Sequence, residues 1–216
     1  RSYHYLLQYG NLSWKLPSPF DRRRNESMIA NRMQEIMKEI MPMLESPEWV
    51  VLAADETKAT FETEIRRAWL KKGEKTTIKT DRNRKHQNYF GALNQNTGQH
   101  HLVPIEWQNQ ETMIDALTHI SKAYPDKRIC IIWDNAAWHK GKELRKHLER
   151  GHSLERIHLI NLPSYAPDQN PQEHVWKYGK EKISNQTFDS FEEMIDLFEK
   201  ILNRTFNYKM SEFVLR

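Results

Sequence analysis

The chain has 216 residues, of which 38% are hydrophobic and 29% are charged, which excludes a disordered tail and fits one globular α/β domain with a short appendage. No apolar stretch approaches the length of a membrane span and no secretory signal is visible, so no membrane partner is expected. The single cysteine, Cys130, excludes a disulfide framework and a cysteine-based zinc site within one chain. The net charge of +4 is a mild bias towards polyanions.

Residues 1–25 differ from the rest of the chain. Aromatic and aliphatic side chains form a patch over residues 3–14, and the run LPSPFDRRRN combines two prolines with three consecutive arginines. Because proline holds the backbone extended, we expect a basic linker here, leaving the remnant of another module. The predicted organisation is therefore this remnant and linker over 1–25, one folded domain over 26–203 and a C-terminal tail over 204–216.

Hydrophobic periodicity predicts the elements of the folded domain in chain order. Helical spacing predicts helices over 26–45, 113–124, 142–150 and 191–202, and a further helix starting near Pro171. Apolar runs predict buried strands over 49–55, 128–134 and 157–162, and two runs flanking the turn-like NQNTG predict a hairpin. The first three strands suit antiparallel pairing, and the last two suit parallel pairing with crossover helices.

Two predicted strands end on an acid, WVVLAAD at Asp55 and RICIIWD at Asp134. Ligands gather beyond the carboxyl ends of strands in open α/β sheets, and two carboxylates side by side repel unless a cation lies between them. Oxygen ligands suit Mg²⁺ or Mn²⁺. Glu173 falls in the first turn of the helix starting near Pro171 and can reach back over the strand ends. Because the chain has 29 acidic residues, an alternative stays open, in which these acids are solvated or cap loops.

The segments around these acids resemble a known family. IIWDNAAWH (131–139), followed by LPSYAPDQNPQEHVWK (162–177), closely resembles the signature of mariner-superfamily DDE transposases, in their bacterial insertion-sequence branch. ADET (54–57) and RRAWLKKGEK (66–75) fit the same family. The resemblance implies an RNase H-like fold, a mixed five-stranded sheet with helices on both faces. It also implies that the stump over residues 1–16, ahead of the basic linker, is the remnant of an N-terminal DNA-binding module.

The resemblance implies that Asp55, Asp134 and Glu173 are the catalytic metal ligands. Asp55 would bridge two Mg²⁺ or Mn²⁺ ions roughly 3.5–4 Å apart, with Asp134 on one ion and Glu173 on the other. Water would cut double-stranded DNA at the terminal inverted repeats of a transposon, and the freed 3′-OH would attack target DNA. The implied assembly is a homodimer that pairs two DNA ends, and the implied location is the bacterial cytoplasm, on DNA.

Other residues are assigned weaker roles. Near the acids, the candidates for orienting the metal shell or shaping the loop before Glu173 are Asn135, His139, Asp168, Asn170 and His174, with local hydrogen bonding as the alternative. Trp176 is predicted to be core. The candidates for contact with the DNA backbone are Arg22, Arg23, Arg24, Lys71, Lys72, Lys75, Lys79, Arg82, Arg84 and Lys85. For the run 71–86, with seven Lys or Arg against two acids, a solvated loop is the alternative.

Two other functions stay open from the sequence. One is a domesticated DNA-binding protein that keeps the fold without chemistry, against which the presence of all three acids argues. The other is an RNase H-like nuclease or resolvase without strand transfer, which the sequence motif around Glu173 disfavours.

Overall fold

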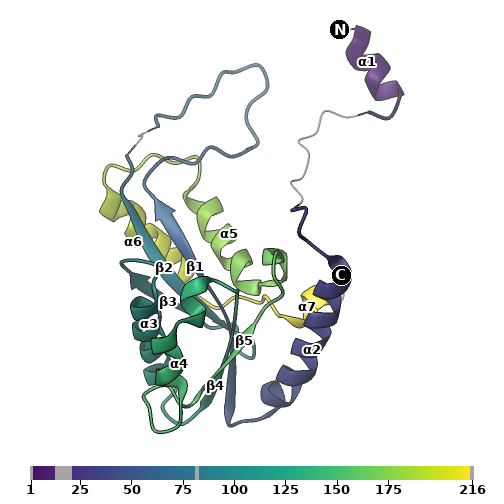
Figure 1. The fold of residues 1–216 in the computed structure, drawn as a ribbon. Helices are drawn as coiled ribbons and strands as arrows, with labels where there is room; N and C mark the ends of the chain where they lie inside the picture. Colours follow the sequence, from purple (N-terminus) through teal and green to yellow (C-terminus); the bar gives the residue numbers. More distant parts are fainter. Residues whose placement is uncertain (1, 13–20, 81–82, 215–216) are drawn as a thin grey trace.

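A computed structural model describes residues 2–12, 21–80 and 83–214 of the chain. Five strands form one mixed sheet in the order β3-β2-β1-β4-β5 (Figure 1). Their bounds are β1 Trp49–Thr60, β2 His86–Asn94, β3 His100–Ile105, β4 Arg128–Trp133 and β5 Ile157–Asn161. The β1–β2 and β2–β3 pairs are antiparallel, and the β1–β4 and β4–β5 pairs are parallel. The predicted mixed five-stranded sheet is therefore confirmed.

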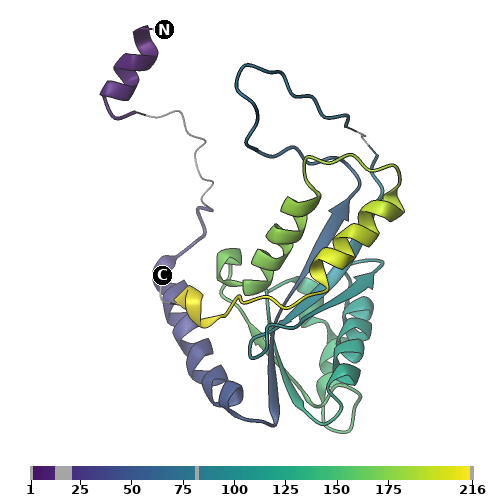
Figure 2. The same cartoon turned by 180° about the vertical axis from the view of Figure 1, so that it is seen from behind.

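Helices cover both faces of the sheet (Figures 1 and 2). One face carries α3 (Gln110–Ala123) and α4 (Lys142–Leu148). The other face carries α2 (Glu26–Glu45), α5 (Pro171–Ile183) and α6 (Phe191–Leu202). The short elements are α1 (Ser2–Tyr9), α7 (Ser211–Val214) and the 3₁₀ turns η1 (Ala137–Lys140) and η2 (Pro167–Gln169), with α1 standing apart from the sheet in both views. No helix among the described residues is long and apolar enough to cross a membrane.

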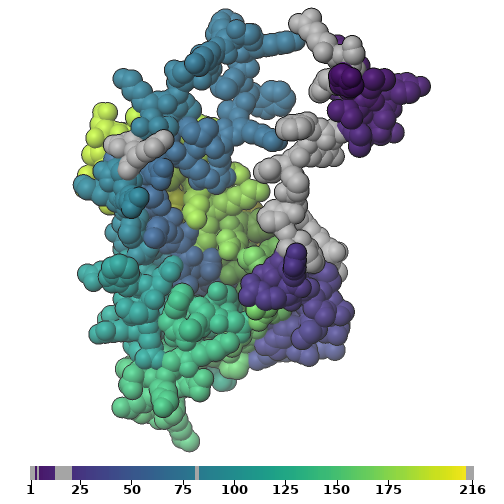
Figure 3. Space-filling model, turned by 45° about the horizontal axis from the view of Figure 1, so that its top comes forward, coloured from purple at the N-terminus to yellow at the C-terminus, as the bar shows by residue number. Residues whose placement is uncertain are grey.

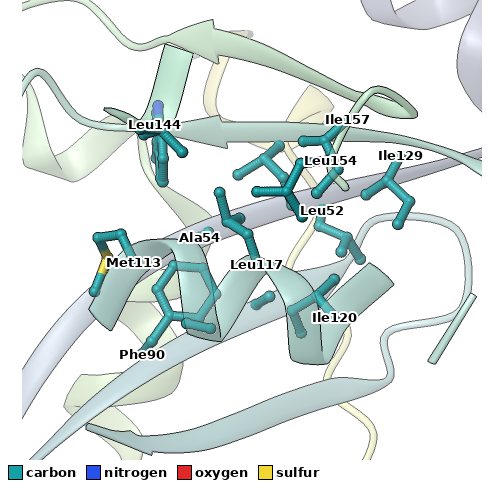
Figure 4. Packing of buried hydrophobic residues seen from close by; sticks show 14 of the residues in the cluster. Leu52, Ala54, Phe90, Met113, Leu117, Ile120, Ile129, Leu144, Leu154 and Ile157 are labelled. Carbon is teal, nitrogen blue, oxygen red and sulfur yellow. The ribbon is translucent and has the colours of Figure 1, made fainter. Parts of the chain in front are cut away.

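Side-chain alternation along the central strands builds two cores. Leu52 and Ala54 of β1 point to the side of α3, where they pack with Met113 and Leu117 (Figure 4). Val51 and its neighbours at odd positions point to the side of α2. Burying a leucine of this kind stabilises the fold by about 1.5–3 kcal/mol, so the two cores together fix the register of β1.

The prediction that the first strand ends at Asp55 is wrong, because β1 continues to Thr60. The antiparallel partner β2 pairs with β1 from Leu52 to Thr60, which extends the strand beyond the apolar run. The parallel partner β4 stops earlier, and the last parallel pair joins Ala53 to Ile132. Asp55 therefore lies within β1 but beyond the end of its neighbour β4.

The C-terminal segment packs onto the domain. Thr205 forms an isolated bridge with Gln99, and the Phe206 amide donates to the Gly98 carbonyl at 2.8 Å. Met210 is buried in the core beneath α2, and the Lys209 ammonium donates to the Gln95 carbonyl at 2.5 Å. This part of the predicted tail thus belongs to the folded unit.

His100 joins β3 to two helices inside the molecule. Its Nδ1 lies 3.0 Å from the Leu202 carbonyl, to which it donates, and its Nε2 accepts from the Gln172 amide at 3.0 Å. These partners require a neutral ring. Burial lowers the pKa of His100 to about 4, although the hydrogen bond to Leu202 opposes this shift.

We expect the free energy of unfolding to fall in mild acid because of His100. In the unfolded chain the ring titrates near pH ~6.5, so the contribution is intact above that pH and is lost as the pH falls towards about 4. The predicted loss from this group at pH 5 is about 2 kcal/mol. Urea unfolding of the wild type and of His100→Asn at pH 7 and pH 5 measures it. An equal pH dependence in both proteins would contradict the assignment.

Candidate active site

The register of the sheet brings Asp55 and Asp134 next to each other. The last parallel pair is Ala53 with Ile132, and the two aspartates lie two residues further along their chains. Asp55 continues the alternation of β1 and points to the same face as Ala53, and both aspartates line one cavity with Glu173 of α5. Asp55 is half-buried and Asp134 is exposed, so the pair lies at the mouth of a depression.

Glu173 on α5 brings a third negative charge to this place. Burial raises the pKa of Asp55 well above its usual range, and the charges of Glu173, Glu56 and Asp134 raise it further. Burial also raises the pKa of Glu173, where Lys180 opposes the shift and Asp134 adds to it. The three carboxylates therefore repel one another electrostatically, and a bound cation would relieve this repulsion.

Asn170 fixes the start of α5 against β1. Its side-chain amide donates to the Ala54 carbonyl at 2.9 Å. Its Oδ1 accepts from the backbone N–H of Gln172 at 3.1 Å, which caps the helix. The side chain is buried. Because Ala54 immediately precedes Asp55, this contact sets the position of Glu173 relative to Asp55.

A buried histidine holds Asp134. The His139 Nδ1 donates to Asp134 Oδ1 at 2.9 Å, and its Nε2 donates to Glu56 Oε1 at 2.8 Å. The imidazole is only 1% exposed and stacks on the Trp133 ring at 3.8 Å. Burial alone would lower the pKa of His139, but the hydrogen bonds to Asp134 and Glu56 outweigh it and raise the pKa to about 9. Burial raises the pKa of Asp134, but the hydrogen bonds from His139 and the Ala136 backbone N–H, together with the charges of His139 and Lys140, lower it below its usual value.

Asn135 joins the ends of β4 and β5. Its amide donates to the Leu162 carbonyl at 2.5 Å, and its Oδ1 accepts from the Lys140 ammonium at 3.0 Å. Asn135 and Lys140 both line a cavity of about 480 Å³. The same cavity is lined by all three acids, by Asn170 and by the loop that leads into α5.

Asp168 and His174 have protein partners of their own. Asp168 forms an ion pair with Arg24, whose guanidinium also donates to the Tyr165 carbonyl at 3.1 Å. The ring of His174 lies 5.4 Å from that of Tyr208, in the C-terminal segment. The ion pair between Asp168 and Arg24 therefore connects the loop before α5 to the linker.

The predicted DNA-contacting cations fall into three groups. Arg22 is exposed, whereas Arg23 lies over the Tyr165 ring at 4.2 Å and Arg24 is largely covered. We call the segment 61–85 between β1 and β2 the basic arm, and the predicted cations that are exposed there are Lys71, Lys72, Lys75, Lys79, Arg84 and Lys85. Arg82 lies outside the described residues. Arg23 and Arg24 thus have partners within the chain, whereas Arg22 and the basic arm present their charges to solvent.

The donor set suits a hard divalent ion, because it consists of carboxylate oxygens. Within residues 2–12, 21–80 and 83–214, no three His, Cys, Asp or Glu side chains converge tightly enough to hold one ion. Mg²⁺ in phosphoryl-transfer sites is commonly held by one or two carboxylates, with waters and substrate phosphates as the other ligands.

Sequence reasoning missed three residues of this site. Trp176 is buried as predicted, but its indole Nε1 also donates to Asp55 Oδ2 at 3.1 Å. Gly91 pairs with Asp55 across β1 and β2 and leaves room for that indole. Glu56 is the buried partner of His139, and strand alternation beyond Asp55 was the signal that could have placed it on the opposite face.

The sheet order, with helices on both faces, defines an RNase H-like fold. A family model described as DDE superfamily endonuclease matches residues 50–195, and the chain belongs to this family. The resemblance found in the motifs is thereby confirmed at the level of the DDE superfamily.

The chain is also similar to a curated protein and to solved structures. An uncharacterized protein, y4pE/y4sA of Sinorhizobium fredii (strain NBRC 101917 / NGR234), is 26% identical over 108 residues, which are 49% of this chain and 75% of that protein. The Mos1 strand transfer complex matches with a TM-score of 0.69 at 16% identity, over 99% of this chain and 65% of the Mos1 chain. The catalytic domain of Mos1 mariner transposase matches with a TM-score of 0.56 at 16% identity, over 93% and 91%. The chain thus has the fold of that catalytic domain and spans just under two thirds of the longer Mos1 chain.

We predict that Gly91→Ala destabilises the protein by about 1–3 kcal/mol through overpacking. The new Cβ would clash with the Cζ2 and Cη2 atoms of Trp176 and, on its other side, with Nε2 of Gln172, a clash that a change at Trp176 leaves in place. Phenylalanine lacks both atoms, so Gly91→Ala should cost less in a Trp176→Phe background. Urea unfolding of the two single variants and the double variant measures the coupling. Additive effects, within about 0.5 kcal/mol, would contradict the steric argument.

Proposed function

We propose that this chain is the catalytic part of a DNA transposase. It hydrolyses phosphodiester bonds at transposon ends and then joins the freed 3′-OH to target DNA. The observation that carries the proposal is that Asp55, Asp134 and Glu173, matched to the acids of the DDE motif, line one cavity in a chain of the DDE endonuclease family. Residues 26–203 would form the catalytic domain, following a remnant of a DNA-binding module and its linker over 1–25.

The proposed cofactor is a pair of Mg²⁺ or Mn²⁺ ions held by Asp55, Asp134 and Glu173. Solved structures of the Mos1 paired-end complex include one with Mn and one with Mg, which supports the choice of metal. Two such ions supply an activated water or 3′-OH on one side of the phosphate and stabilise the leaving oxygen on the other.

The protein side chains would contribute positioning. His139 donates a hydrogen bond to the Asp134 carboxylate and is anchored in turn by the buried Glu56. Trp176 holds one oxygen of Asp55, and Asn170 holds the first turn of α5. Carboxylates fixed in this way lose little conformational freedom when a metal and a phosphate bind, which favours catalysis by positioning.

The proposed partner is double-stranded DNA. The Mos1 structures are described as paired-end and strand transfer complexes, which supports transposon-end and target DNA as the substrates here and a homodimer as the active assembly. The exposed cations of the basic arm, and Arg22, would bind the phosphate backbone without reading sequence. The bacterial cytoplasm, on DNA, remains the expected location.

We predict that Asp134→Asn and Glu173→Gln each lower DNA cleavage at least about 100-fold, because loss of a metal ligand removes several kcal/mol of charge stabilisation. The assay uses the full-length protein with DNA carrying the element's own ends and Mg²⁺ or Mn²⁺. A matched control is Asp126→Asn, since Asp126 is an exposed acid just before β4, at the other end of that strand.

Each outcome decides between functions. Cleavage that survives in both acid variants would refute the metal site. Binding of the cognate ends by the wild type without any cleavage would indicate a domesticated DNA-binding protein. Cleavage without joining of the 3′-OH to target DNA would indicate a nuclease or resolvase.

A further inference from the structure

A second group of cations lies next to the acidic cavity, on the opposite side from the basic arm. It begins at Lys140 in η1 and continues along α4 with Lys142, Arg145 and Lys146. In Figure 3 the basic arm projects at the top, and the segment of η1 and α4, in green, lies well below it. The DNA contacts predicted from the sequence included none of these four residues.

Helix geometry gathers three of these cations into one stripe. At about 100° per residue, Lys142, Arg145 and Lys146 fall within an arc of about 100° on α4. Leu144, at about 200° from Lys142, is fully buried in the core and fixes which side of the helix faces out. We call Lys142, Arg145 and Lys146 the α4 stripe.

The side chains of the α4 stripe are not neutralised by acidic side chains of the described residues. All three side chains are exposed, and none forms an ion pair with an acidic side chain of the described residues. Unneutralised cations grouped on one helix face repel one another by a few tenths of a kcal/mol per pair, so the arrangement slightly destabilises the free protein. A polyanionic partner would remove this repulsion.

Lys140 connects the stripe to the cavity. It lies two residues before Lys142, lines the cavity of the three acids, and its ammonium is 3.0 Å from Asn135 Oδ1. A line of positive charge therefore runs outward from the place where a scissile phosphate would lie. Along α4, Lys142 and Lys146 are separated by about 6 Å of helix rise, close to two steps of about 3.4 Å along a DNA strand.

We propose that the α4 stripe binds the phosphate backbone of the DNA duplex whose scissile phosphate enters the acidic cavity. The contact lies on the side of the cavity opposite the basic arm, so the two cationic surfaces hold the duplex on both sides of the cleavage point. This inference rests on the proposed function. Because α4 packs on the core through Leu144, the stripe fixes the direction in which the duplex leaves the cavity, without selecting a sequence.

The test measures DNA binding separately from chemistry. The triple variant Lys142→Glu, Arg145→Glu, Lys146→Glu is made in an Asp134→Asn chain, and duplex binding is measured across a salt series without divalent ions. Each lost phosphate contact should reduce the slope of log K against log salt by about 0.9, so a reduction of about 2–3 is expected. A neutral variant, with glutamine at the same three positions, should show the same reduction and covers the case in which the reversed charges disturb folding.

The matched control reverses three exposed lysines on other helices, Lys38, Lys122 and Lys200. Both triple variants are made in the Asp134→Asn chain and lower its net charge by the same six units, from +5 to −1, because each reversal removes two charges. Equal slopes in the stripe variant and the control would overturn the proposal, since net charge alone would then explain the effect.

Crosslinking tests the direction of the duplex. The only native thiol, Cys130, is buried, so Lys146→Cys and Lys75→Cys each introduce one reactive thiol. With thiol-reactive groups tethered to the DNA backbone, we expect the two variants to crosslink on opposite sides of the cleavage position. Crosslinks on the same side would overturn the proposal. A stripe effect together with inactive wild-type protein would instead refute the proposed function and leave the binding surface in place.

Discussion

Repulsion between carboxylates at one end of the sheet is the constraint on which the rest of this structure depends. Asp55, Asp134 and Glu173 are brought together by the parallel register of β1 and β4 and by the capped start of α5. The contacts around them oppose the tendency of like charges to move apart, through Trp176 on Asp55 and His139 on Asp134. Folding therefore stores an unfavourable charge arrangement, and under the proposed function a bound divalent cation would relieve it and stabilise this end of the sheet.

Much of the fold could be predicted because it depends on local patterns. The apolar runs before Asp55 and Asp134 have the length of buried strands, and Phe191 to Leu202 repeats at the helical period. The end of β1 could not be predicted, because it is set by pairing with β2, a contact between residues about 30 positions apart. The residues near Asp55 do not by themselves indicate that β2 pairs with this part of the chain.

The candidate site divides in the same way. Asp55, Asp134 and Glu173 stand in motifs that can be recognised along the chain, whereas their supports come from distant segments. The role of Glu56 depends on His139, which the fold places beside it. The role of Gly91 depends on the Trp176 indole, which lies against β2 at this position. The linker arginine Arg24 was predicted to face DNA, yet its guanidinium is engaged by Asp168 and the Tyr165 carbonyl, a contact across more than 140 positions.

The C-terminal segment limits how short an active fragment can be. Met210 fills space beneath α2, and its amide donates to the Gln95 side chain at 2.7 Å. A fragment cut at the end of α6 would leave a hole lined by apolar side chains between α2 and the loop before α5, and filling such space is worth a few kcal/mol. An expression fragment intended for crystals or inhibitor screening should therefore retain residues through 210.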